Sequence, residues 1–224
     1  FMSSPGLILW SDSGFHSPYA MSVYVCLQEK GLPFSLNTLN LEQNQHTSPE
    51  LSSLLLTGRI PCLQHDGFTL SESSAITEYL DEIFPAPDYP GVYPADLQQK
   101  AVARQVQAWL RSDFLALRTE RPTDVIFSGR KYPPLSAAGQ RDVKKLFSGA
   151  LQLLGQRSSL SGQWSVADCD LAVMLNRLAL HGDVLPDRLQ EYAALQWQRA
   201  SIQLWVNEVI KLNNTYTGNG QSNI

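Results

Sequence analysis

The sequence predicts an α/β unit followed by an all-helical unit. Strand-like apolar runs alternate with helical patterns up to Leu70, and the apolar patterns after Leu70 all have helical spacing. Between the two units, residues 85–94 contain four prolines and one glycine, which is typical of a stiff linker at a domain boundary. We therefore expect an α/β domain at residues 1–86, a linker at 87–95, a helical domain at 96–216 and a disordered tail at 217–224.

Composition limits the classes of protein to which the chain can belong. Its 224 residues are 43% hydrophobic and 17% charged, which indicates a soluble globular protein with room for one or two cores. No apolar run is long enough to cross a bilayer and no leader is recognisable, so we expect a cytoplasmic protein, with Phe1 an artificial addition before Met2. No basic block suggests nucleic acid as a partner.

Charge is distributed unevenly between the two units. Residues 1–86 carry two basic and nine acidic side chains, a balance of −7, whereas residues 87–224 carry 15 basic and 12 acidic ones, a balance of +3. Opposite signs favour docking of one unit on the other and place a mildly cationic wall beside any cleft between them.

The first part of the α/β unit contains two strands and two helices. Ser17-Pro18 is a helix start, because a serine oxygen caps the free N–H groups and proline at the first position loses no needed donor. Gly31 ends that helix. The other expected elements are strands at Leu7–Trp10 and Phe34–Leu41 and a short helix from Ser48-Pro49 to Leu56.

A hairpin and a helix complete the α/β unit. Asp66-Gly67 separates the apolar runs Ile60–Leu63 and Phe68–Leu70, a strong hairpin signal in which both turn residues need positive φ. An amphipathic helix from Ser71 to Phe84 follows. Its N-terminus is suited to binding an anion, or else Ser71 simply caps the helix and binds nothing.

The second unit has an entirely helical pattern. Three arginines lie seven residues apart on the helix from Asp96 to about Arg118; they line a cleft or, the interpretation we favour, form a solvated face. They are Arg104, Arg111 and Arg118. Ser165 and Asp168 fit a capping box, which assigns Asp168 to folding rather than to catalysis. The remaining helices are expected at Ala137–Leu154, Val166–Leu180, about Arg188–Gln198 and Ile202–Leu212.

Four motifs in this order resemble the cytosolic glutathione S-transferases over nearly the whole chain. They are Ser17-Pro18-Tyr19, Arg59-Ile60-Pro61, the run from Leu70 to Ile76 and the capping segment from Ser165 to Asp170. Two further stretches, RSDFLALRTERPTD and RLALHGD, are similar to the YfcF-type bacterial members. The resemblance implies a thioredoxin-like N-terminal domain with a mixed four-stranded sheet, followed by an all-α domain.

The resemblance also implies a binding site for glutathione. The Ile60–Pro61 bond would be cis, which leaves the backbone of Ile60 free to pair with the cysteinyl part of the tripeptide. Glu72 would bind the γ-glutamyl ammonium group, and Ser73 with the helix N-terminus its carboxylate. For the glycyl carboxylate our candidate is His46, although a solvent-exposed histidine is an equal alternative.

Ser17 is the predicted catalytic residue. A thiol with a pKa near 8.5 is mostly protonated at neutral pH, and a hydroxyl donating to the sulfur at a helix start stabilises the thiolate. The alternative is an ordinary N-cap, and Ser11, Ser13 or His16 could share the role. Cys62, directly after Pro61, could support redox chemistry only if its side chain faced the ligand, which strand alternation argues against.

The expected function is therefore conjugation of glutathione to an electrophile, with glutathione-dependent peroxidase activity as a second reaction. The resemblance implies glutathione as co-substrate without a further cofactor or metal, and a homodimer without membrane or nucleic-acid partners. A small hydrophobic electrophile or organic peroxide would bind between the Ser11–His16 loop and the helices near Asp113 and Phe114. A thiol–disulfide reductase and a non-catalytic regulatory module on the same scaffold are the alternatives.

Overall fold

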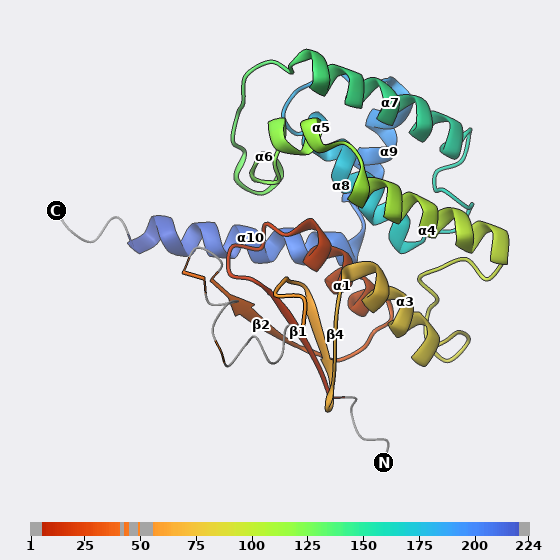
Figure 1. Ribbon diagram of the computed structural model, residues 1–224, viewed down its shortest axis with the longest axis vertical. Helices are drawn as coiled ribbons and strands as arrows, with labels where there is room; N and C mark the ends of the chain where they lie inside the picture. Colours follow the sequence, from red (N-terminus) through yellow and green to blue (C-terminus); the bar gives the residue numbers. More distant parts are fainter. Residues whose placement is uncertain (1–5, 41–42, 45–48, 50–55, 220–224) are drawn as a thin grey trace.

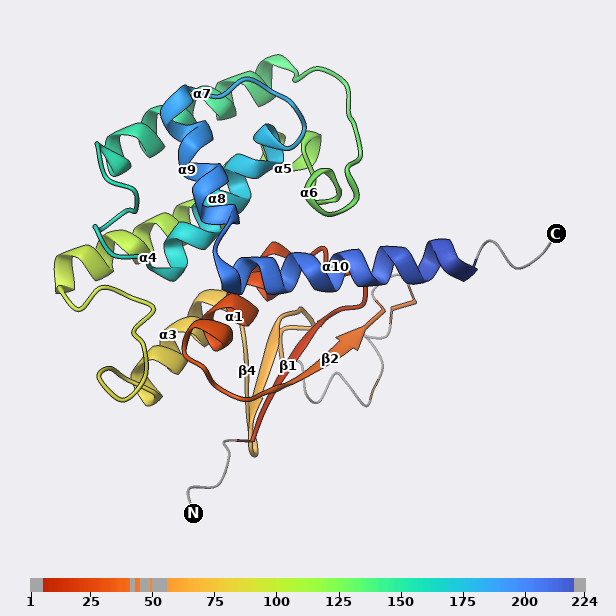
Figure 2. The same cartoon turned by 180° about the vertical axis from the view of Figure 1, so that it is seen from behind.

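The computed structural model describes residues 6–40, 43–44, 49 and 56–219. Residues 215–219 are described by their backbone alone. A sheet lies at one end of the molecule and a group of helices at the other (Figure 1). Helices α1 (Pro18–Glu29) and α10 (Ala200–Asn219) run side by side between them, as the opposite view also shows (Figure 2). The predicted division into an α/β unit and a helical unit matches this arrangement.

The sheet has four strands in the order β2-β1-β3-β4. Their bounds are Leu7–Asp12 for β1, Ser35–Leu39 for β2, Cys62–His65 for β3 and Phe68–Ser71 for β4. Strand β1 pairs in parallel with β2 and antiparallel with β3, which forms the hairpin with β4. The prediction of a mixed four-stranded sheet is confirmed.

The hairpin is present, but its turn differs from the expected one. Asp66 has φ of 53°, whereas Gly67 is outside the positive-φ region, so only one turn residue uses it. The interpretation of Ser71 as a helix cap is wrong. Ser71 ends β4 opposite Cys62 and accepts a hydrogen bond from Thr57 Oγ1 at 3.0 Å, and Glu72 occupies the N-cap position of the next helix.

Seven more helices follow in the described part of the chain. They are α3 (Ser73–Ile83), α4 (Leu97–Ser112), α5 (Leu115–Glu120), α6 (Asp124–Ser128), α7 (Ala137–Leu154), α8 (Val166–Ala179) and α9 (Asp187–Trp197). The expected bounds of α7 are those observed, because Ser136 accepts from Gly139 N at its start and Gly155, at φ 54°, ends it.

The single helix predicted from Asp96 to Arg118 is wrong, since the chain breaks between α4 and α5. Phe114 adopts the left-handed conformation with φ of 65°. The Asp113 carboxylate accepts from Phe114 N at 2.7 Å and from Trp109 Nε1 at 3.1 Å, so the side chain replaces helical partners at the break. Helix α5 then ends at Arg121-Pro122, as expected.

Two further helices differ from the prediction. Helix α6 was not predicted, and α10 runs to Asn219, so the expected tail begins at least three residues too early. An established helix adds one hydrogen bond per further residue, which can carry it through polar sequence. The expected helix from Ser48 to Leu56 lies largely outside the described residues.

The two units are docked tightly, and the linker is packed between them. Lys30, whose side chain is fully buried, pairs with Asp81 at 2.8 Å and donates to the carbonyl oxygens of Phe84 and Pro90, both at 2.9 Å. The linker residues Val92 and Tyr93 are buried.

Opposite charges meet where the units dock, as their charge balance predicts. Arg104 of α4 lies 3.1 Å from Glu78 of α3, and Arg199 pairs with Glu29 of α1. In both pairs the acid comes from the α/β unit and the base from the helical unit. Separately, none of the helices in the described residues combines the length and apolarity that a membrane span requires.

Candidate functional site

Strand register brings the predicted site segments to one end of the sheet. Trp10 of β1 lies opposite Cys62 of β3, which in turn lies opposite Ser71 of β4. The loop after β1, the Ile60-Pro61 segment before β3 and the start of α3 after β4 therefore leave the sheet at the same edge. This edge is the candidate active site.

Ser17 begins helix α1 at this edge. Its side-chain oxygen accepts a hydrogen bond from Ala20 N at 3.1 Å, so it does cap the helix. The cap bond uses the oxygen as acceptor and leaves the hydroxyl hydrogen available to a ligand. The first turn of α1 contains no acidic side chain, but the Asp12 carboxylate accepts from Ser17 N at 3.2 Å and offsets part of the positive end of the helix dipole. Capping and donation to a sulfur are thus compatible roles for the same hydroxyl.

Asp12, which sequence reasoning missed, holds the loop that presents Ser17. Its carboxylate is 7% exposed and accepts from His16 N at 2.8 Å, from Ser17 N at 3.2 Å and from Ser11 Oγ at 3.1 Å. These bonds fix the backbone just before α1. The clue in the sequence was an acid at the end of a buried strand, followed by Ser13-Gly14.

Glu72 and Ser73 lie together at the start of α3. Glu72 is exposed and has φ of 72°, a conformation that costs free energy in a non-glycine residue and is concentrated at functional sites. Ser73 is 3% exposed and is the first residue of the helix. An exposed carboxylate therefore stands beside a buried hydroxyl at a positive helix terminus, which suits an amino acid head group with both charges.

Arg111 of α4 joins this site from the other unit. Its Nε and Nη2 donate to Ser73 Oγ at 3.1 and 2.7 Å, its Nη1 donates to Asp170 Oδ2 at 3.0 Å, and the guanidinium lies 4.8 Å from the centre of the Tyr19 ring. Although burial lowers the pKa of Arg111, the charge and hydrogen bond of Asp170 raise it above its ordinary value. Arg111 thus connects the starts of α1 and α3.

The prediction of a solvated arginine face is wrong for Arg111, whose side chain is 16% exposed. Arg104, at 54% exposure, fits that prediction apart from its ion pair with Glu78. Arg118 donates from Nε to the carbonyl oxygen of Asp113 at 3.0 Å and lies half-buried. The three arginines share a sequence spacing but not an environment, because the helix breaks and tertiary partners differ.

The remaining predicted ligand-binding residues have different outcomes. The Ile60–Pro61 peptide bond is cis, Ile60 is half-buried and Pro61 is buried beside the sheet edge. His46 lies outside the described residues. Asp168 of α8 accepts from Ser165 N at 2.9 Å, Leu160 N at 2.9 Å and Tyr192 Oη at 2.7 Å, which is the folding role expected for it.

All three cysteines are buried, including Cys62 at this edge of the sheet. Cys62 is 1% exposed and packs with Trp10, Leu39 and Ile60, and burial raises its pKa. Cys26 and Cys169 are fully buried, and burial raises their pKa values as well. A thiol in such surroundings is a poor nucleophile. Within the described ranges, no three histidine, cysteine or acidic side chains gather as metal ligands would.

A small cavity of about 20 Å³ opens beside the first turn of α1. It is lined by Pro18, Tyr19, Leu110, Arg111, Asp170, Val173, Met174 and Arg177. The expectation that the second substrate lies near Asp113 and Phe114 stays a prediction; the Phe114 side chain itself is fully buried and packs on Trp109 with ring centres 4.8 Å apart. Residues of α4 and α8, rather than Phe114, line the space next to α1.

Comparisons with known proteins match both units of this fold. Residues 16–83 match the family model of the glutathione S-transferase N-terminal domain, and residues 96–211 match that of the glutathione S-transferase C-terminal domain. The N-terminal match includes Ser17, Ile60, Pro61, Glu72 and Ser73. This chain belongs to the glutathione S-transferase family.

Individual relatives show how similar this chain is to known members of the family. A glutathione transferase homologue from Burkholderia gl BGR1, solved with bound glutathione, is 42% identical, with a TM-score of 0.74 over 92% of this chain and 98% of that one. Mouse glutathione S-transferase theta-1 is 31% identical over 52% of this chain and 50% of its own. The chain thus spans about half the length of that curated relative. The theta class transferase from Xanthomonas axonopodis pv. citri, 22% identical with a TM-score of 0.73, shares the fold.

Proposed function

We propose that this protein is a glutathione transferase that holds glutathione at the sheet edge and ionises its thiol with Ser17. The observation that carries the proposal is the Ser17 hydroxyl, whose oxygen is fixed by Ala20 N while its hydrogen stays free to donate. A sulfur placed there would gain a charge-assisted hydrogen bond and the field of α1. The 42% identical homologue with bound glutathione supports the same ligand for this chain.

The chemistry of the site also indicates which residues would bind the other groups of glutathione. Glu72 would bind the γ-glutamyl ammonium group, and the Ser73 hydroxyl with the N-terminus of α3 its carboxylate. Arg111 positions Ser73, because two of its nitrogens donate to that oxygen and leave the hydroxyl hydrogen to the ligand. Ile60 would pair through its backbone with the cysteinyl residue, and His46 stays our prediction for the glycyl carboxylate.

The ionised thiol would attack an electrophilic carbon or one oxygen of an organic peroxide. The buried Cys62 argues against a thiol–disulfide reductase that uses a cysteine of its own. A homodimer and a cytoplasmic location are parts of this proposal. The exposed apolar side chains of Leu97 and Val102 on α4 are available to a second copy, and light scattering that finds only monomer would contradict dimerisation.

Ser17→Ala tests the central step. We expect the pKa of bound glutathione to rise by about one unit, because one of the two stabilising effects is lost, and conjugation at neutral pH to slow about tenfold. Ultraviolet absorbance of the bound thiolate across a pH series measures the shift, and the rate should recover at higher pH. Calorimetry should still detect glutathione binding.

A matched control separates loss of the hydroxyl from loss of the helix cap. Ser136 caps α7 with the same 3.1 Å bond, to Gly139 N, and lies on a helix of the other unit. Ser136→Ala should lower stability by about 1 kcal/mol, as Ser17→Ala should, but leave the thiolate absorbance unchanged. Equal thiolate absorbance in wild type and Ser17→Ala would reassign the catalytic role. No binding of glutathione by the wild type would favour a non-catalytic module.

A further inference from the structure

Arg177 of α8 is a buried cation without an anionic partner in the described part of the chain. It is 6% exposed, and its recorded hydrogen bond runs from Nη1 to the carbonyl oxygen of Arg121 at 3.0 Å. Its Nε has no hydrogen-bond partner, and no described carboxylate lies within 4.0 Å of its guanidinium. Buried charges in proteins are normally paired, so this arrangement needs an explanation.

The surroundings of Arg177 do not supply the missing charge. Burial lowers the pKa of Arg177 to about 10; the neighbouring Tyr19 acts against this shift and Arg118 acts with it. Asp170 lines the same cavity, but its Oδ2 already accepts from Arg111 Nη1 at 3.0 Å and from Gln107 Nε2 at 3.1 Å. Two arginines and one aspartate therefore line the cavity, and the aspartate is paired with Arg111.

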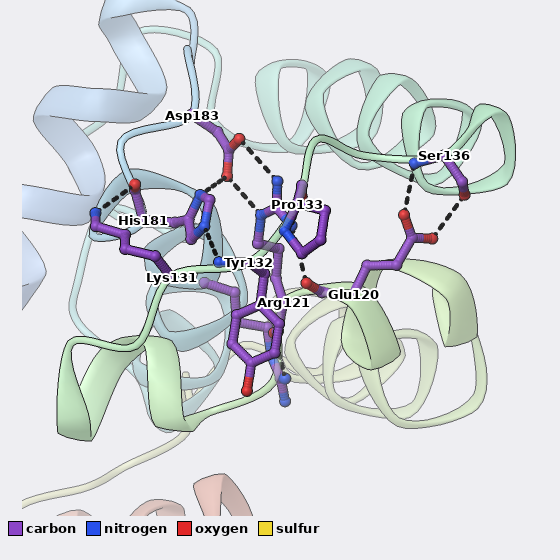
Figure 3. A network of polar contacts seen from close by, with 9 residues as sticks. Glu120, Arg121, Lys131, Tyr132, Pro133, Ser136, His181 and Asp183 are labelled. Atoms are coloured by element: carbon purple, nitrogen blue, oxygen red, sulfur yellow. Dashed lines mark hydrogen bonds and ion pairs between the residues drawn. The ribbon is translucent and has the colours of Figure 1, made fainter.

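Arg177 is held by Arg121, whose own guanidinium is hydrogen-bonded through all three of its nitrogens. Figure 3 shows Arg121 between Asp183 and the carbonyl groups of Glu120 and Pro133. Because the backbone oxygen of Arg121 holds Nη1 of Arg177, the guanidinium of Arg177 has a fixed position beside the cavity. A fixed, desolvated cation is a strong recognition group for an anion.

The cavity lies against the start of the helix that Ser17 caps. Pro18 and Tyr19, which follow Ser17 directly, form one wall, and Met174 and Val173 form an apolar part of another. Its volume of about 20 Å³ exceeds that of one water-sized group only slightly. It can therefore admit one oxygen of a flat carboxylate, whereas a tetrahedral sulfonate or phosphate is too bulky.

We propose that Arg177 and this cavity form the subsite for a carboxylate on the second substrate, so that the protein prefers electrophiles that carry a carboxylate near the reacting carbon. The inference rests on the proposed function, since the cavity matters to the reaction only if a glutathione thiolate forms beside Ser17. It replaces the expectation of a purely hydrophobic electrophile with that of an anionic one.

The test compares benzoylacrylate with its neutral methyl ester. In both, the thiolate forms a carbon–sulfur bond, the double-bond electrons move toward the ketone, and water returns a proton, so no group leaves. We expect the wild type to accelerate addition to the acid, relative to the uncatalysed rate, at least about tenfold more than addition to the ester. Arg177→Gln should abolish this preference while keeping addition to the ester.

Arg104→Gln is the matched control, since Arg104 is an exposed arginine on α4 that pairs with Glu78. It should keep the preference for the acid. An equal preference in Arg177→Gln and wild type, or none in wild type, overturns the inference but leaves the transferase intact. Addition to neither compound, together with no glutathione binding by calorimetry, rejects the proposed function and the inference with it.

A measurement on the wild type alone covers the case in which Arg177→Gln does not fold. The saturated analogue benzoylpropionate should inhibit addition at about tenfold lower concentration than its methyl ester, because only the acid can pair with Arg177. Equal inhibition by acid and ester overturns the inference.

Discussion

Arg121 and Arg177 are both buried arginines of the helical unit, joined by a hydrogen bond, yet their surroundings differ. Arg121 is 1% exposed and donates to both oxygens of Asp183, at 2.8 and 3.2 Å, and to two carbonyl groups. Arg177 donates from Nη1 to the carbonyl oxygen of Arg121 and borders a cavity. A fully paired buried cation serves the fold, whereas an incompletely paired one beside a cavity is available to a ligand.

The largest expected effect comes from removing the partner of Arg121. Asp183→Ala leaves a buried guanidinium that cannot lose its proton, so we expect the free energy of unfolding to fall by about 4 kcal/mol. Urea denaturation measures it. A loss below about 1 kcal/mol would show that the pair contributes little and would remove the contrast with Arg177.

A smaller loss is expected at the ion pair between Arg111 and Asp170. Arg111→Met deprives Asp170 of its cation, but Asp170 keeps the bond from Gln107, so we expect a loss of about 2 kcal/mol. The variant should also bind glutathione several-fold more weakly, because Ser73 loses the donors that orient it. If calorimetry finds the same glutathione affinity in Arg111→Met and wild type, Arg111 has no role in binding the ligand.

The Asp183 pair also predicts a pH dependence. Burial raises the pKa of Asp183, but the hydrogen bond and charge of Arg121 and the contact with His181 outweigh this and lower it below its ordinary value. Its stabilising contribution is therefore present above about pH 4 and is lost as pH falls through the lowered pKa. Asp183→Asn should lose less stability than wild type between neutral pH and pH 3, and parallel urea-denaturation profiles would contradict this.

The smallest expected effect is at Arg177. Arg177→Met exchanges one hydrogen bond for relief of an unpaired buried charge, so stability should change by less than about 1 kcal/mol. Thermal unfolding of Arg177→Met and Asp183→Ala, measured under the same conditions, compares the two losses directly. A loss as large as that of Asp183→Ala would mean that Arg177 serves the fold after all.

Sequence patterns predicted elements whose determinants are local. The bounds of α7 follow from Ser136 and Gly155, and the start of α1 follows from Ser17-Pro18. The break at Asp113-Phe114 was not predictable from apolar spacing, because the spacing continues across it while a side chain replaces the helical hydrogen bonds.

The site was predicted in the same uneven way. Ser17, Pro61 and Ser73 lie in short motifs, so the sequence alone could name them as candidates. Arg111, Asp12 and Arg177 could not, because their roles depend on partners distant in the sequence or on the absence of one. Arg104, Arg111 and Arg118 are evenly spaced in the chain, and only the tertiary structure distinguishes them.

The two hydrogen bonds from Arg111 to Ser73 cross from the helical unit to the α/β unit. A ligand held by Ser73 would thus depend on a side chain that belongs to the opposite unit. By thermodynamic linkage, glutathione should then strengthen cohesion between the units as much as that cohesion strengthens its binding. Slower amide exchange in α4, a helix the tripeptide need not touch, would be the signature of this coupling.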